Sequence, residues 1–182
     1  MKKFLMLCLT IVLGLSIVAC GNSGTEGSSN DSLDKNPVAN VVISDFKAKD
    51  IDGNDVTKEI FKDNKVTVVN LWGTFCGPCI DEMPDLQKFY EQYKNKGINV
   101  VGIVGDVKAG EDTTTAKEVI NQTGVKYTNI LPDTTLYKDL VSKFDYVPAT
   151  ILIDSDGKIL ESFIPGSTNE KGFENLVKEY VK

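Results

Sequence analysis

Two cysteines separated by two residues are the side chains of this sequence best suited to covalent chemistry. Cys76 and Cys79 enclose the dipeptide Gly-Pro. Thiols at this spacing can form a disulfide with each other, and a thiolate can exchange that disulfide with one in another molecule. The chain has no His, and its 20 basic residues are all Lys. This composition excludes Ser-His-Asp and Cys-His catalysis, imidazole metal ligands and bidentate phosphate binding by Arg.

Two structural roles compete with a redox role for the pair. A structural zinc site usually takes four protein ligands, and two thiols without a His do not supply them. A structural disulfide between Cys76 and Cys79 would close too short a loop to restrict the unfolded chain much. We therefore interpret the pair as a redox-active dithiol and expect no metal and no cofactor. The spacing by itself leaves both alternatives open.

The segments on either side of the cysteines predict the elements that hold them. Residues 66–72 are β-branched and almost continuously apolar, as in a strand buried on both faces of a sheet. Residues 80–93 carry apolar side chains at helical spacing. The pair therefore lies where a strand ends and a helix begins, and the positive end of the helix dipole stabilises an anion there. This predicts Cys76 as the nucleophile and Cys79, one turn deeper on the same face, as the resolving thiol.

The rest of the pattern predicts an α/β fold in which helices flank a mixed central β-sheet. A short β-hairpin is expected around Phe46 and Val56, ahead of the strand that precedes the cysteines. Strands and helices then alternate, and two adjacent strands come before the last helix. The expected strands are 66–72, 98–104, 149–154 and 158–164, and the expected helices are 77–95, 114–123, 135–143 and 169–181.

The first 36 residues have a composition unlike that of the remaining chain. Residues 1–19 begin with a positive charge and continue with an apolar run that is short for a membrane span, which predicts a secretory signal peptide. The run ends in a sequence that resembles a bacterial lipobox, which implies a lipidated Cys20; a secretory signal that merely contains a Cys is the alternative. Residues 20–36 are rich in Gly, Ser, Asn and Asp and predict a flexible tether. We expect the folded domain over residues 37–182.

The residues around the cysteines resemble a known family. Trp72-Gly73-Thr74-Phe75-Cys76-Gly77-Pro78-Cys79, followed by Glu82 and Pro84, is similar to the active site of ResA/TlpA-like thioredoxin-fold proteins. The likeness continues through residues 98–104 and Val147-Pro148-Ala149-Thr150 to the C-terminus. It implies the thioredoxin fold with the hairpin as an N-terminal extension, in a lipoprotein form. Gly77 departs from the Glu of ResA-type motifs, which argues against narrow selectivity for apocytochromes.

The resemblance assigns roles to residues beyond the pair. It makes Glu82 a functional acid, and its place three residues after Cys79 would independently let a desolvated carboxylate relay the proton of that thiol. A solvated helix carboxylate is the alternative. The family has a cis bond before Pro148, which would present the Val147 backbone to extended substrate segments. Trp72 is expected to flank the site as well as to fill the core.

We therefore expect a membrane-anchored, extracytoplasmic thiol-disulfide oxidoreductase that reduces disulfides in exported client proteins. The resemblance implies a CcdA- or DsbD-like membrane thiol carrier as electron donor, and apocytochrome c or a secreted methionine sulfoxide reductase among the clients. A disulfide-forming oxidase and a non-catalytic, lipid-tethered binding module are the alternatives. A peroxidase that needs Arg does not fit this composition. The net charge of −6 argues against nucleic acid as a partner.

Overall fold

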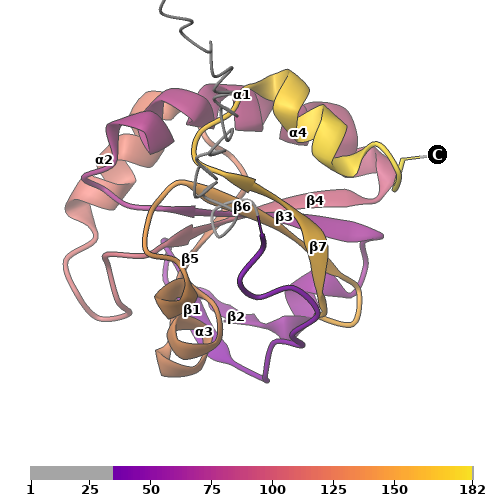
Figure 1. Ribbon diagram of the computed structural model, residues 1–182. Helices are drawn as coiled ribbons and strands as arrows, with labels where there is room; N and C mark the ends of the chain where they lie inside the picture. The colour runs from indigo at the N-terminus through magenta and orange to yellow at the C-terminus, as the bar shows by residue number, and fades with distance from the viewer. Residues whose placement is uncertain (1–34, 182) are drawn as a thin grey trace, which may run out of the picture.

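Residues 35–181, which the computed structural model describes, form one mixed β-sheet with helices on both faces (Figure 1). The strands are β1 (Lys47–Asp50), β2 (Asp55–Thr57), β3 (Val66–Trp72), β4 (Ile98–Val104), β5 (Thr128–Leu131), β6 (Ala149–Asp154) and β7 (Ile159–Pro165). Their order across the sheet is β2-β1-β5-β4-β3-β6-β7. The predicted signal peptide, Cys20 and the tether up to residue 34 lie outside the described residues.

Strand β3 carries the chain into the cysteine motif from the middle of the sheet. It pairs in parallel with β4 along its whole length and antiparallel with β6. All its residues are buried, which explains why its sequence is almost continuously apolar. The predicted bounds of β3, β4 and β6 are confirmed.

The N-terminal hairpin is confirmed as well, and it belongs to the same sheet. β1 pairs with β2 and, on its other side, with β5. β5, which runs parallel to β4, is absent from the strands predicted above. β5 has only four residues, and its buried Asn129 interrupts the apolar pattern by which a short strand is recognised. β5 supplies the edge on which the hairpin joins the sheet.

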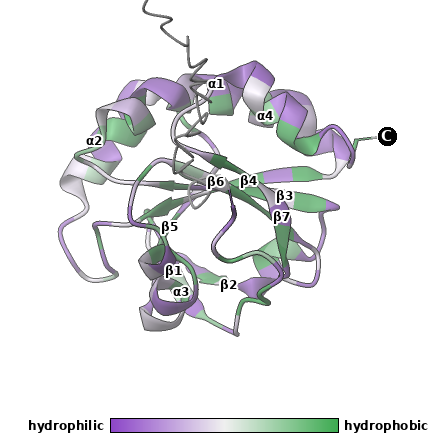
Figure 2. Cartoon of the chain, in the orientation of Figure 1, coloured by the Kyte–Doolittle hydropathy of each residue, from purple (hydrophilic) through white to green (hydrophobic). Residues whose placement is uncertain are grey.

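The helices are α1 (Gly77–Tyr93), α2 (Thr114–Thr123), α3 (Thr134–Asp139) and α4 (Glu170–Val177). In Figure 1, α1, α2 and α4 cover one face of the sheet, and α3 lies on the other side with β1. Helices α1, α2 and α4 share one buried apolar cluster with β3 and β4, whereas α3 contributes Leu136 to a second cluster behind the sheet. Hydrophobic residues lie mainly on the central strands, and hydrophilic ones line the outer sides of the helices (Figure 2).

Three predicted helices end earlier than expected. The α-helical part of α1 stops at Tyr93, and a 3₁₀ turn follows before Gly97 adopts the left-handed conformation. The predicted helix 135–143 is wrong in its second half, because Leu140 leaves helical geometry and only a 3₁₀ turn continues. Helix α4 ends at Val177 rather than at residue 181. None of the helices in the described part of the chain is long and apolar enough to cross a membrane.

Gly102 on β4 is a point where the packing between strands depends on the missing side chain. An added Cβ would lie 2.1 Å from the side-chain oxygen of Asn129, which accepts a hydrogen bond from the Trp72 indole. We therefore expect Gly102→Ala to lower the free energy of unfolding by about 1–3 kcal/mol in urea titrations. Gly77→Ala is the control, since no heavy atom lies within 4 Å of its added Cβ. Equal stability of the two variants would contradict this account of the packing.

Candidate active site

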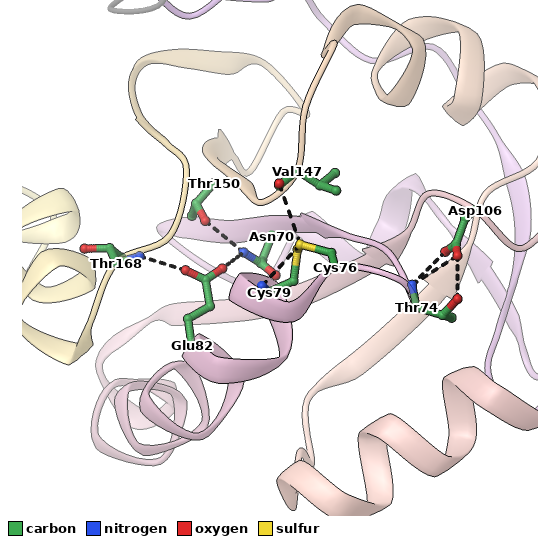
Figure 3. The surroundings of a disulfide bond; sticks show 9 residues. All are labelled: Asn70, Thr74, Cys76, Cys79, Glu82, Asp106, Val147, Thr150 and Thr168. Atoms are coloured by element: carbon green, nitrogen blue, oxygen red, sulfur yellow. Dashed lines mark hydrogen bonds between the residues drawn. A yellow bond between two sulfur atoms is a disulfide. The ribbon is translucent and has the colours of Figure 1, made fainter.

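The cysteine pair lies where β3 has ended and α1 begins, and it is closed as a disulfide (Figure 3). Cys76 is the N-cap residue of α1, and its sulfur accepts a hydrogen bond from the backbone N–H of Cys79 at 3.2 Å. Cys79 is fully buried, whereas Cys76 keeps 6% of its surface exposed. A client disulfide can therefore approach Cys76 but not Cys79.

The loop before β6 faces the nucleophile. The peptide bond between Val147 and Pro148 is cis, as the resemblance implied. The carbonyl oxygen of Val147 lies 3.6 Å from the sulfur of Cys76. The two predicted substrate-contacting residues of this loop are therefore brought next to the thiol that would attack.

A second loop contact holds the segment just before the cysteines. Asp106, directly after the end of β4, accepts hydrogen bonds from the backbone N–H of Thr74 at 3.0 Å and from its hydroxyl at 2.6 Å. Because the segment from Thr74 to Cys76 joins β3 to α1, this contact fixes the approach of the chain to the nucleophile (Figure 3).

Glu82 is buried beneath the disulfide rather than solvated on the helix surface. Only 3% of it is exposed, and each carboxylate oxygen accepts one hydrogen bond of 2.8 Å. The donors are the side-chain amide of Asn70 on β3 and the backbone N–H of Thr168, in the loop before α4. Asn70 also donates to the hydroxyl of Thr150 on β6, so that side chains of three elements meet under the cysteines.

Burial changes the protonation of this carboxyl group. It raises the pKa of Glu82 from its ordinary value of 4.5 to about 7, against the opposing effect of the hydrogen bonds from Thr168 and Asn70. A carboxyl group with a pKa near neutrality can both accept and return a proton at physiological pH. Glu82 is thus chemically suited to exchange protons with a buried thiol three residues away.

Residues 35–177 match the model of the protein family described as Redoxin. This chain belongs to that family. It is similar to the thiol-disulfide oxidoreductase ResA of Bacillus anthracis, with 30% identity over 134 residues that cover 72% of this chain and 70% of the relative. ResA of Bacillus subtilis is 27% identical over 179 residues, which cover 96% of this chain and 90% of the relative.

Solved structures agree with this assignment. The thioredoxin domain of a thiol-disulfide oxidoreductase from Bacteroides vulgatus is 25% identical and superposes with a TM-score of 0.62, covering 79% of this redoxin and 98% of that domain. The predicted thioredoxin fold is therefore confirmed. Together with the cysteine pair, the relatives make this redoxin a ResA-like thiol-disulfide oxidoreductase.

The side chain of Trp72 lies in the core of the redoxin rather than on its surface. It is completely buried and donates its indole N–H to Asn129 at 2.9 Å. The predicted core role is confirmed, but a direct contact with substrate does not fit this burial. Phe75 is the exposed aromatic residue beside the pair, with 76% of its surface accessible. It lines a groove of about 530 Å³ that also reaches Val147.

Several residues of the site were not predicted from the sequence. Asn70 does have a signal, because an amide in a strand of apolar residues indicates a buried polar contact. Phe75 belongs to the quoted motif, but only its exposure in the structure points to a contact with clients. Thr168 contributes only its backbone N–H, and Asp106 follows its strand by two residues; neither has a signal in a single sequence.

The raised pKa of Glu82 should make the stability of this redoxin depend on pH. The folded state keeps the Glu82 proton up to about pH 7, whereas the unfolded chain loses it near 4.5. Stability from this group is therefore complete below pH 4.5 and is lost as the pH rises through 7. Relative to a Glu82→Gln variant, the oxidised wild-type protein should lose roughly 3 kcal/mol of unfolding free energy across this window. Urea titrations at several pH values measure the difference, and a constant difference would contradict the shift.

Proposed function

We propose that this redoxin is a membrane-anchored, extracytoplasmic reductase of disulfides in exported proteins. The observation that carries the proposal is the arrangement of the pair: a poorly exposed Cys76 at a helix N-terminus, a buried Cys79 behind it and a buried Glu82 of raised pKa. Such an arrangement suits an exchange reaction in which only the first thiol meets the client.

In the proposed cycle, the thiolate of reduced Cys76 attacks a client disulfide. A bond forms between Cys76 and one client sulfur, and the other client sulfur leaves as a thiolate that takes a proton from water. Cys79 then gives its proton to the Glu82 carboxylate and attacks the sulfur of Cys76. The mixed disulfide breaks, and the second client sulfur leaves as a thiolate that takes a proton from water. Glu82 returns its proton to the solvent before the next cycle, and two electrons have passed from the redoxin to its client.

The surface beside Cys76 suits an extended client segment. Phe75, which is exposed and supplies apolar area, and Val147 both line the groove. A peptide laid along the Val147 backbone would bring its disulfide to the sulfur 3.6 Å from the Val147 carbonyl. Contacts with backbone and with apolar surface do not discriminate strongly between client sequences. Broad client selectivity also agrees with Gly77, which replaces the Glu of ResA-type motifs.

The electron donor and the cellular location are the parts of the proposal that rest on the sequence alone. The N-terminal pattern that ends at Cys20 supports export and lipidation, and a CcdA- or DsbD-like thiol carrier would then re-reduce the pair across the membrane. Apocytochrome c and a secreted methionine sulfoxide reductase are the proposed clients. Cys20→Ala should abolish labelling by a radioactive or alkyne fatty acid and release the protein from the membrane fraction; retention of both would exclude the anchor.

The reduction potential tests the direction of the reaction. The purified protein is equilibrated with glutathione and dithiothreitol buffers, and the fluorescence of Trp72, the only Trp in the chain, reports the redox state. A potential near or below about −250 mV supports the reductase. A potential near about −120 mV would replace it by the disulfide-forming oxidase.

A further inference from the structure

Asn70 is a polar side chain placed in the middle of an apolar strand. It is completely buried in β3, where its neighbours on the same face are Val68 and Trp72. Burying an amide is costly unless it makes hydrogen bonds, and a strand of this kind gains more stability from an aliphatic residue. The position of Asn70 therefore calls for an explanation in terms of what it contacts.

The nitrogen of this amide uses both of its hydrogens on other elements. One N–H is donated to Glu82 on α1 at 2.8 Å, and the other to the hydroxyl of Thr150 on β6 at 3.0 Å. The Thr150 contact fixes the plane of the amide against the neighbouring strand. With the plane fixed, the first N–H holds one oxygen of the Glu82 carboxylate in a defined place.

The oxygen of the same amide is buried and has no hydrogen-bond partner among the described residues. In Figure 3 the carbonyl end of Asn70 is directed towards the cystine, on the side of Cys79. A donor arises there when the disulfide is reduced, because Cys79 then carries an S–H group. The buried carbonyl of Asn70 is placed to accept that hydrogen.

We propose that Asn70 is a positioning residue of the redox centre, which holds the Glu82 carboxylate through its nitrogen and the reduced Cys79 thiol through its oxygen. The inference rests on the proposed function, since it concerns the step in which Cys79 resolves a mixed disulfide. In that step the proton moves from Cys79 to Glu82, the Cys79 sulfur bonds to Cys76, and the Cys76–client bond breaks. One amide that contacts both proton donor and proton acceptor sets the path between them.

The groups that surround the Glu82 carboxyl determine how its pKa should change when Asn70 is replaced. Tyr127, the residue before β5, interacts electrostatically with the carboxylate. The Thr168 backbone N–H holds its second oxygen, and the cysteines lie at the start of its own helix. The hydrogen bond from Asn70 lowers the pKa of Glu82. Burial raises the pKa of Glu82, and without this hydrogen bond less opposes that effect. The pKa of Glu82 should therefore rise further when Asn70 is replaced.

The test follows the resolving step in the full chain carrying Cys8→Ser and Cys20→Ser, so that only the pair reacts. Reduced protein is mixed with 5,5′-dithiobis(2-nitrobenzoate) in a stopped-flow instrument. The first thionitrobenzoate released reports attack by Cys76, and the second reports resolution by Cys79. Rates are recorded between about pH 5 and 9 to obtain the midpoint and the plateau at high pH.

Asn70→Leu, which keeps the branched shape of the side chain but can make neither hydrogen bond, should move the midpoint of the second phase up by about one pH unit. Its plateau rate should fall about tenfold, because the thiol is no longer held. Thr67→Val is the matched control: Thr67 is a buried residue of the same strand, and its hydroxyl makes no hydrogen bond among the described residues. It should keep both values. Asn70→Ala replaces the Leu variant if that variant does not fold.

The outcomes separate this inference from the function on which it rests. An unchanged midpoint in a folded Asn70 variant overturns the role of Asn70, while the wild-type reaction stands. A moved midpoint with an unchanged plateau overturns the contact with Cys79. A wild-type protein that never releases the second thionitrobenzoate would overturn the proposed function and this inference together.

Discussion

Replacing Cys76 by Ser is expected to abolish client reduction, because a hydroxyl at this position cannot exchange with a disulfide. Cys79→Ser should stop the reaction at a later point. In that variant Cys76 still attacks, but no second thiol follows, and the mixed disulfide with the client accumulates. Of the two residues, Cys76 is the partly exposed one and Cys79 is fully buried. Cys76→Ser should therefore block the attack on the client, and Cys79→Ser should block only the resolution that follows it.

The measurement is turnover of a protein disulfide in the presence of dithiothreitol, together with mass spectrometry of the trapped adducts. Thr67→Val is a suitable control, since Thr67 is buried in β3, does not line the groove and makes no hydrogen bond through its hydroxyl among the described residues. A mixed disulfide on Cys79 in the Cys76→Ser variant would contradict the assigned order of attack. Unchanged client redox state in cells that carry Cys76→Ser would instead favour the non-catalytic binding module.

The elements that hold the cysteines could be predicted from the sequence because their burial leaves a clear pattern of apolar residues. β3 and β4 are buried on both faces, so nearly every residue is apolar and the strands stand out from the polar turns around them. β5 is not recognised by the same pattern, because it contains Asn129, whose side-chain oxygen accepts a hydrogen bond from the Trp72 indole. α3 was predicted too long because its apolar spacing continues past Leu140, where the backbone leaves the helix.

The residues of the site also fall into a group that the sequence predicts and a group that it does not. Cys76, Cys79 and Glu82 lie on one turn-and-helix segment, so their relation follows from spacing along the chain. The partners of Glu82 come from elsewhere: Asn70 is 12 residues away and Thr168 is 86 residues away in sequence. Only the pairing of β3 with β6 and the return of the chain before α4 bring these groups together. A single sequence can mark Asn70 as a buried polar residue, but it contains no signal for which residues it meets.

Glu82→Gln should slow the resolution of a mixed disulfide by roughly 10²–10⁴-fold at neutral pH, the range lost when a positioned general base is removed. Gln keeps the size of the side chain and its oxygen can still accept a hydrogen bond, but it cannot take the Cys79 proton. In the wild-type protein the resolving rate should rise with pH and level off above the Glu82 pKa of about 7. The Gln variant should lose this inflection.

The control is Asp81→Asn, which neutralises an exposed carboxylate beside Glu82 on the same helix. If long-range charge governed the resolving thiol, the two variants would slow the second phase of thionitrobenzoate release alike. If proton transfer to a buried carboxylate governs it, only Glu82→Gln removes the inflection near pH 7, because only Glu82 combines burial with a place three residues from Cys79. An inflection that survives in Glu82→Gln would assign the proton to another acceptor and remove Glu82 from the cycle.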